Sequence, residues 1–226
     1  MTGPDDGGDV TAPRRRGRPA ADEVALATDD LLDGALEAFA ERGFDGTSVR
    51  ELARRLGVSH NLIPQRIGSK ETLWFAAVDH GFGALSADLA VAIESSAGLD
   101  DVEQLRALVT AFIAANARRP ALLRIINQEA VADGPRLDHL FVNYIEPVRR
   151  YGVGVLARLE ERGRVRSGSV GLVYFLMTHG AAGPVALPGL AERFGETVDP
   201  HDEEAVQRHA EATAAMIFDG LLLPES

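Results

Sequence analysis

The strongest constraint on the fold is a helical spacing of apolar residues, which runs through almost the whole chain from Asp22 onward. Apolar side chains recur three or four positions apart, and the strict alternation typical of strands is absent. Glycine and proline interrupt this spacing, with the longest break at residues 183–200. The pattern predicts an all-α protein. Beyond the N-terminal third, helices are expected at about residues 69–95, 101–117, 121–131, 135–162, 169–182 and 201–222.

The N-terminal third predicts three helices, two of them short and joined by a tight turn. A first amphipathic helix ends at Gly43. Ser48, with Glu51 three residues later, forms a capping box that starts the second helix, and Gly57 ends it. The hydroxyl of Ser59 then caps a third helix. Such an arrangement is typical of a helix-turn-helix unit that binds DNA.

The charge distribution suits DNA binding at one end of the chain. The 226 residues have a formal net charge of −11, which by itself argues against a nucleic-acid partner. The acidic excess lies outside residues 14–74, where basic and acidic residues balance. From Arg42 to Lys70, six basic residues accompany only two acidic ones. A local basic surface on an acidic protein is therefore expected.

Several other classes of protein are disfavoured. There is no cysteine, so disulfides and thiolate metal sites are excluded. No apolar run approaches the roughly 18 uninterrupted residues of a membrane span, so we expect a cytoplasmic protein without membrane contact. We find no metal-binding histidine pair, phosphate-cradling loop or nucleophile elbow, and expect no cofactor, no metal and no enzyme. Residues 152–157 match a dinucleotide-binding glycine pattern, but inside a helical stretch that no strand precedes.

Residues 31–53 read LLDGALEAFAERGFDGTSVRELA, and this segment is similar to the N-terminal signature of the TetR family. The similarity continues at Gly57-Val58-Ser59 and resumes with the sequence GSKETL at residues 68–73. It covers about the first third of the chain. The remainder resembles the family only in the order of its helices and in its ending.

The resemblance implies a tri-helical DNA-binding head followed by a larger helical domain that binds an effector and dimerises. We accordingly expect a disordered basic arm at residues 1–21, a helix-turn-helix domain at 22–68 and an effector-binding and dimerisation domain at 69–226. The implied function is that of a ligand-responsive transcriptional regulator. By family habit it is a repressor, which a hydrophobic small molecule releases from its double-stranded DNA operator.

The sequence departs from the family in its third helix, where it reads Ile63-Pro64-Gln65-Arg66-Ile67 instead of a stretch with two aromatic residues. Pro64 is expected near the fifth position of that helix. There it would remove a backbone donor and clash with the carbonyl four residues earlier, so the helix must be short or bent.

DNA contacts are assigned by residue type and position. His60 and Asn61 follow the expected cap, where side chains reach base edges, and asparagine can pair with adenine through two hydrogen bonds. The other expected contacts are to backbone phosphates, and they position the protein on the DNA without specifying its sequence. These are Thr47, Ser48, Arg50, Ser59, Gln65, Arg66 and Lys70. His60 and Asn61 could instead be solvated polar residues without a role.

The N-terminal arm contains the sequence PRRRGRP at residues 13–19, which is similar to an AT-hook. Arg16 and Arg18 on such a slim chain are expected to enter a narrow minor groove. A solvated basic tail that only accelerates association is the alternative.

The effector domain is expected to enclose a mostly apolar cavity with a few polar anchors. Eleven residues on its helices are candidates, any of which could be ordinary core. They are Phe82, Phe112, Asn116, Ile126, Asn127, His139, Phe141, Tyr144, Tyr174, Met177 and His179.

The last two long helices have apolar stripes that could pair with those of a second copy in a homodimer, as the resemblance implies. The stripes contain Leu172, Tyr174, Phe175, Met177, Gly180, Ala181 and Ala182, then Val206, Ala210, Thr213, Met216, Ile217 and Leu221. An intramolecular core is the alternative for both stripes. A constitutive architectural DNA-binding protein, or an enzyme that uses the helical cavity, remains an alternative function. The sequence identifies neither the effector, nor the operator, nor the regulated genes.

Overall fold

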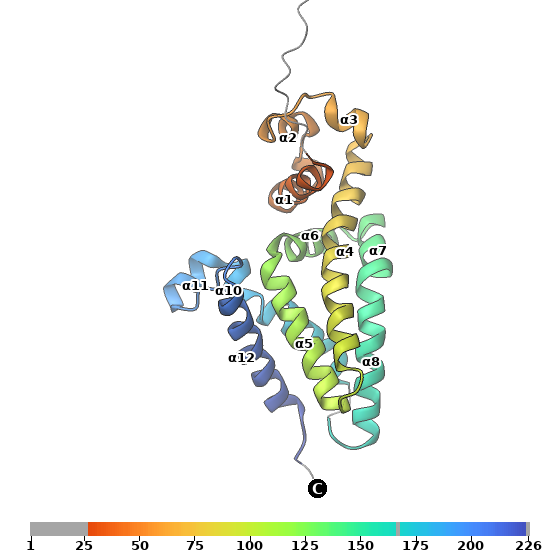
Figure 1. Ribbon diagram of the computed structural model, residues 1–226, viewed down its shortest axis with the longest axis vertical. Helices are drawn as coiled ribbons and strands as arrows, with labels where there is room; N and C mark the ends of the chain where they lie inside the picture. The colour runs from red at the N-terminus through yellow and green to blue at the C-terminus, as the bar shows by residue number, and fades with distance from the viewer. Residues whose placement is uncertain (1–26, 166–167, 225–226) are drawn as a thin grey trace, which may run out of the picture.

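The computed structural model describes residues 27–165 and 168–224, which fold almost entirely into helices (Figure 1). The predicted all-α fold is confirmed. Within those ranges the only strand-like pairing is an isolated bridge between Val165 and Leu222. The helices are α1 (Thr28–Gly46), α2 (Val49–Arg55), α3 (Leu62–Arg66), α4 (Lys70–Ser96), α5 (Asp101–Arg118), α6 (Pro120–Ala132), α7 (Pro135–Leu140), η1 (Phe141–Ile145), α8 (Glu146–Glu161), α9 (Ser169–Phe175), η2 (Leu176–Gly180), α10 (Gly183–Ala186), α11 (Pro188–Phe194) and α12 (Glu203–Leu221).

The first three helices form one end of the molecule, which we call the head. Figure 1 shows α2 and α3 at the far end from the C-terminus. The predicted stop at Gly43 appears as a kink inside α1, where Gly43 has a φ of 71°. Past the kink the helical turn continues to Gly46. We call the rest of the chain, from α4 to α12, the body.

Helix α4 joins the head to the body. It begins where the Ser69 hydroxyl accepts a hydrogen bond from the Thr72 amide at 3.0 Å, and it continues for 27 residues. In Figure 1 it leaves the head and runs down the body, and it packs against both α1 and α5. This helix therefore takes part in both regions of the molecule.

The head and the upper body share one hydrophobic core. Leu31, Ile63 and Trp74 are no more than 1% exposed and belong to the same buried cluster as Phe82 and Leu122. A second cluster lies lower in the body, where α12 and α8 pack against α5. Because the first cluster crosses from α1 and α3 to α6, the head is packed onto the body rather than tethered to it. The expected boundary at residue 68 therefore lies between two helices that share one hydrophobic core. The division into two domains at this position stays a prediction.

Two expected helices contain a π-helical turn. The segment predicted at 135–162 is continuous, but residues Phe141–Ile145 form the π turn η1. The segment predicted at 169–182 likewise contains η2. Such turns are rare and occur frequently at functional sites.

The expected break at residues 183–200 is wrong in its first two thirds, which contain α10 and α11. Pro184 and Pro188 each lie in the first turn of their helix. The amide that proline lacks has no helical partner there, so proline is compatible with a helix start and is a poor sign of a loop.

Candidate DNA-binding head and central cavity

The second helix and its turn have the expected geometry. The Ser48 hydroxyl accepts a long hydrogen bond of 3.5 Å from the Glu51 amide, as the capping box predicts. Gly57 has a φ of 68°, which glycine adopts without strain and which reverses the chain after α2. The turn closes with a hydrogen bond from the Val58 amide to the Ala53 carbonyl at 3.0 Å.

The third helix begins later than predicted. It spans only Leu62–Arg66, and Asn61 precedes it without a side-chain cap. The Ser59 hydroxyl accepts a hydrogen bond from the Asn61 amide at 3.4 Å, and it thereby stabilises the turn that precedes the helix. His60 and Asn61 therefore lie in the exposed turn that leads into α3.

The late start changes what Pro64 does. It is the third residue of α3, where an amide would have no helical partner, and the carbonyl four residues earlier lies outside the helix. The expectation that the helix is short is confirmed. The expected loss of a helical hydrogen bond and the expected clash are wrong, because the late start of α3 places Pro64 in its first turn. Ile63 is completely buried and anchors α3 to the head.

Seven of the predicted DNA contacts lie on the outer surface of α2, the turn and α3. These exposed residues are Ser48, Arg50, Ser59, His60, Asn61, Gln65 and Arg66. Two neighbouring arginines are instead occupied by acidic partners: Arg54 pairs with Glu51, and Arg55 pairs with Glu41 at 2.7 Å. The hydrogen bond from Arg54 lowers the pKa of Glu51, which therefore stays ionised.

Two other predicted contacts take part in the structure of the head. The Thr47 side chain is buried, with its hydroxyl 2.7 Å from the Gly43 carbonyl and 3.1 Å from that of Ala38. In this geometry the Thr47 hydroxyl stabilises the α1 kink, and a phosphate contact by Thr47 stays a prediction. Lys70 donates to the Asp45 carbonyl at 3.3 Å and lies over the Phe44 ring. Arg16 and Arg18 lie outside the described residues.

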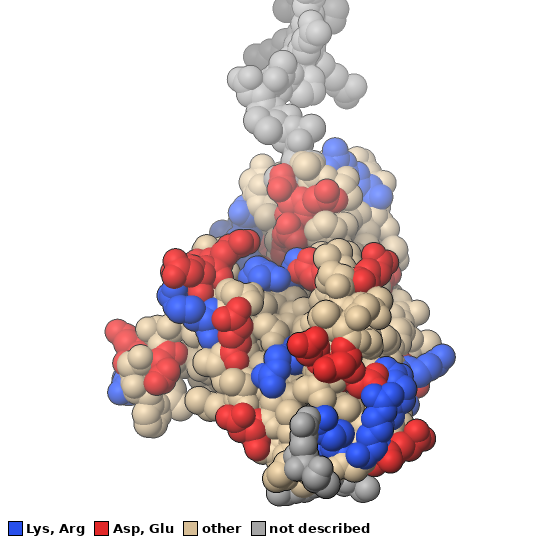
Figure 2. All heavy atoms as spheres, turned by 60° about the horizontal axis from the view of Figure 1, so that its bottom comes forward, with Lys and Arg blue, Asp and Glu red and all other residues tan. Residues whose placement is uncertain are grey.

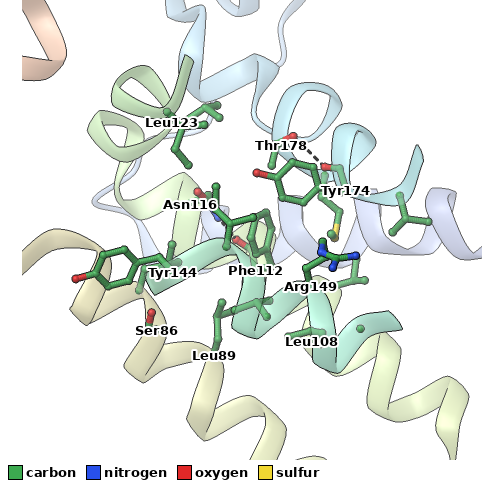
Figure 3. Close-up of a pocket in the computed structure, with 18 of the residues that line it drawn as sticks. Ser86, Leu89, Leu108, Phe112, Asn116, Leu123, Tyr144, Arg149, Tyr174 and Thr178 are labelled. Atoms are coloured by element: carbon green, nitrogen blue, oxygen red, sulfur yellow. Dashed lines mark hydrogen bonds between the residues drawn. The ribbon is translucent and has the colours of Figure 1, made fainter. Parts of the chain in front are cut away.

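An apolar cavity of about 80 Å³ lies in the middle of the body. Helices α4, α5, α6 and α8 surround it, together with α9 and the two π turns (Figure 3). Seven of the eleven predicted residues line it: Phe82, Phe112, Asn116, Ile126, Tyr144, Tyr174 and Met177. These residues come from six different elements, so the fold brings together side chains far apart in the sequence.

Four predicted residues do not line the cavity. Phe141 is 43% exposed, at the first position of η1. His139 lies outside the cavity against Asp79, with its Nε2 2.6 Å from an Asp79 carboxylate oxygen. His179 and Asn127 contact one another at 3.2 Å, near the exposed surface of η2. The expectation that these four residues contact a ligand receives no support from the cavity lining, and it stays a prediction.

Sequence reasoning missed Ser86, Arg149 and Thr178, all of which line the cavity. Arg149 is the only charged side chain in the lining that the structure describes. The spacing of Tyr144, Val148 and Gly152 places one face of η1 and α8 toward the cavity, and Arg149 lies beside that face. Following this face from Tyr144 would have found it.

The two tyrosines in the lining differ in their partners. The Tyr144 hydroxyl donates to Asp79 on α4 at 2.6 Å, and burial together with this bond raises the pKa of Tyr144. Burial alone raises the pKa of Tyr174, whose hydroxyl has no hydrogen-bond partner among the residues described. Both phenols are therefore protonated at neutral pH. The Tyr144 hydroxyl also links η1 to α4 beside the cavity.

A second group of contacts joins the body to the head. Arg136 on α7 pairs with the buried Glu129 at 2.9 Å, and its guanidinium lies 4.1 Å from the centre of the Phe44 ring and 5.6 Å from that of Trp74. Gln128 donates to the Ala40 carbonyl at 2.8 Å. Because α7 continues through η1 into α8, one continuous helix contacts the head at its start and the cavity at its middle.

An open apolar groove of about 600 Å³, which we call the outer groove, lies between α12 and the α9–η2 segment. Leu172 and Met216 line it and are 64% and 75% exposed. Other residues of the two predicted stripes face the opposite way: Val206 and Ala210 are fully buried, and Tyr174 and Met177 line the central cavity. Each stripe therefore contains both an intramolecular face and an exposed one.

On the face shown in Figure 2, acidic side chains are spread over the body, with basic side chains among them. Across residues 27–165 and 168–224, no group of histidine and acidic side chains is arranged to hold a metal ion. Of the helices described, α4 alone is long and apolar enough to cross a membrane, and its packing against α1 and α5 is that of a core helix.

Comparison with known proteins agrees with this geometry. The family model described as "Bacterial regulatory proteins, tetR family" matches residues 31–77. The HTH-type transcriptional repressor Rv3405c of Mycobacterium tuberculosis is 36% identical over 91 residues, which cover 40% of this chain and 45% of that protein. The repressor AcnR of Corynebacterium glutamicum is 37% identical over 57 residues, covering 25% of this chain and 30% of that protein. The matched region thus spans less than half of either relative and covers at most about two fifths of this chain.

The likeness in fold extends much further than the likeness in sequence. The ketosteroid transcriptional regulator KstR2 of Mycobacterium tuberculosis superposes with a TM-score of 0.67 over 86% of this chain and 94% of that one, at 24% identity. This similarity concerns the fold alone. The structural match covers 86% of the chain, whereas the match to Rv3405c in sequence covers 40% of it.

Proposed function

This chain belongs to the TetR family of bacterial regulatory proteins, and we propose that it is a ligand-responsive transcriptional repressor. As a homodimer in the cytoplasm, it binds a double-stranded DNA operator and leaves it when a hydrophobic small molecule occupies the central cavity. One observation supports this most directly. Helix α4 begins beside the DNA-binding turn and then forms one wall of an apolar cavity.

The head supplies two kinds of DNA contact. His60 and Asn61 precede α3 at its exposed start, where side chains can enter the major groove and read base edges. Arg50 on α2 and Gln65 and Arg66 on α3 are also exposed, and these residue types suit backbone phosphates. The late start of α3 leaves the reading residues on a turn, so their reach differs from that of a longer recognition helix.

We expect Asn61→Ala to change which sequences are bound. Loss of a two-hydrogen-bond contact to adenine costs about 1–3 kcal/mol at one operator position and little elsewhere. Arg50→Ala should instead weaken binding to all sequences alike and flatten the salt dependence by about one unit. Both effects can be measured by fluorescence anisotropy on operator and scrambled duplexes. If Asn61→Ala lowers the affinity for both duplexes equally, Asn61 does not contribute to sequence recognition.

Occupancy of the cavity is expected to reach the head by two routes. The Tyr144 hydroxyl binds Asp79 on α4, and the helix that contains Tyr144 also contains Arg136, which touches Phe44 in the head. A ligand that separates α8 from α4 strains both contacts. In a dimer, the two recognition elements must match half-sites about 34 Å apart, so a small tilt of α4 lowers operator affinity.

Tyr144→Phe tests the first route. The variant keeps the ring in the cavity but loses the bond to Asp79, so ligand binding persists while release from DNA weakens. We expect the ratio of operator dissociation constants with and without ligand to fall roughly tenfold, within the usual range of coupling energies. A compound that raises the melting temperature can serve as the ligand at saturation. Tyr174→Phe is the matched control, since the Tyr174 hydroxyl has no bond to α4.

The alternative functions receive less support. A constitutive architectural protein has no use for a closed cavity joined to its DNA-binding head, and it would bind DNA equally well with every small molecule. The named relatives are regulators and not enzymes, which supports a non-catalytic role. Turnover of a compound that binds the cavity would favour the enzyme instead.

A further inference from the structure

One charged side chain lines an otherwise uncharged cavity. Arg149 lies on α8 among Leu108, Phe112 and Tyr174 in the lining that the structure describes (Figure 3). Its side chain is 45% exposed, so it lies at the mouth of the cavity, where the apolar interior meets solvent. A cation in this position attracts an anion whose remaining part is apolar, because each half of such a molecule then meets a matching environment.

The present partner of Arg149 can be replaced without leaving a charge unpaired. Arg149 donates to Glu146 through Nη2 at 2.9 Å and also through Nε. Glu146 has a second basic neighbour, since Arg150 Nη2 lies 3.7 Å from its carboxylate. If Arg149 turns toward a bound anion, Glu146 remains next to Arg150. The guanidinium fork also matches a carboxylate, which it can bind through two parallel hydrogen bonds.

The size of the cavity restricts the apolar part of the ligand. The volume of about 80 Å³ is well below the roughly 300–1,000 Å³ of typical ligand sites. A slender, flexible chain needs only a narrow separation of the surrounding helices. A rigid fused-ring body requires the whole volume at once.

We propose that the effector is an amphipathic carboxylate with an unbranched apolar chain, whose carboxylate takes the place of Glu146 on Arg149. The chain extends from the mouth into the cavity, toward Phe82, Leu89 and Phe112. This inference rests on the proposed function in assigning the cavity to the effector, and it names the chemical class of that effector.

Calorimetric titration of the full chain with straight-chain carboxylates, from hexanoate to tetradecanoate, tests the proposal. The alcohol and the primary amine of the same chain length as the tightest carboxylate serve as uncharged and cationic probes. We expect the carboxylate to bind at least about tenfold more tightly than the alcohol, because a charge-assisted hydrogen bond is stronger than a neutral one. The amine should bind most weakly.

Three variants separate the role of Arg149 from general electrostatics. Arg149→Gln should weaken carboxylate binding by about ten- to hundredfold and leave the affinity for the alcohol unchanged. Arg150→Gln removes the same charge one residue away, outside the lining, and should change affinity by less than about fivefold. Glu146→Gln removes the competitor and should tighten carboxylate binding by about two- to fivefold.

The proposal is overturned if no carboxylate in the series binds, if acid and alcohol bind equally, or if the Arg149 and Arg150 variants behave alike. Operator binding of the ligand-free protein, followed by anisotropy, is a separate measurement. A chain that binds its operator but no carboxylate remains a DNA-binding regulator with a different effector. Conversely, failure to bind any DNA sequence would refute the regulator while calorimetry still decides the chemistry of the cavity.

Discussion

Met216→Glu should convert the protein into a folded monomer with little operator affinity. Met216 lies in the outer groove and is 75% exposed in the isolated chain, so the substitution should alter its stability by less than about 0.5 kcal/mol. In a two-fold dimer that buries the outer groove, the same charge is buried twice. Each unpaired ion costs several kcal/mol, so the dimer dissociation constant should rise by at least about a thousandfold.

Sedimentation velocity measures the change in mass, and circular dichroism checks that the monomer is folded. Val131→Glu is the matched control, because Val131 is 89% exposed on α6, away from the outer groove. A Met216→Glu protein that still sediments as a dimer would show that another surface joins the two copies. Loss of the dimer in both variants would instead indicate a general effect of added negative charge.

The second large effect is expected at the junction of head and body. Arg136→Met should lower the free energy of unfolding by about 3–5 kcal/mol, since it leaves the buried Glu129 carboxylate without its partner. Glu129 is only 3% exposed, so water cannot solvate its carboxylate in place of the lost guanidinium. The variant also loses the stacking of the guanidinium on Phe44, which holds α7 against the head.

Urea unfolding measures this loss. Arg124→Met removes an arginine from α6 whose acidic partner, Glu37, is solvent-exposed and 4.0 Å away, and it should cost less than about 1 kcal/mol. Adding Glu129→Leu to Arg136→Met should restore part of the stability, because no buried charge then remains. If the double variant is no more stable than Arg136→Met, the stacking on Phe44 and not the ion pair dominates.

Sequence alone was sufficient where structure depends on neighbouring residues. The Ser48 cap and the Gly57 turn each involve groups within about five positions, so their spacing already specifies the geometry. The start of α3 is different. It depends on burying Ile63 against the rest of the head, and this tertiary packing decides whether Pro64 disrupts the helix. Thr47 shows the same limit, because its buried hydroxyl binds carbonyls of the folded α1 kink.

The membership of the cavity was harder to predict for a related reason. Phe141 and Tyr144 are three positions apart, so an α-helix would place them on one face. In a π turn the hydrogen bonds join residues five apart, and the faces are displaced by one residue. Tyr144 therefore lines the cavity while Phe141 faces outward. In the π turn at Leu176–Gly180, Thr178 lines the cavity while the adjacent His179 is exposed, as neighbouring residues on any helix point in different directions.

The small volume of the central cavity also limits how quickly the proposed effector can enter it. A space of about 80 Å³ admits no ligand of ordinary size until the surrounding helices move apart. Packed helices shift on a timescale of roughly microseconds to milliseconds, and entry must wait for such an opening. At high ligand concentration the rate of entry therefore reaches a ceiling equal to the rate of opening. Beyond that ceiling, more ligand increases the occupied fraction without shortening the delay, so the internal motion of the body determines the fastest possible response.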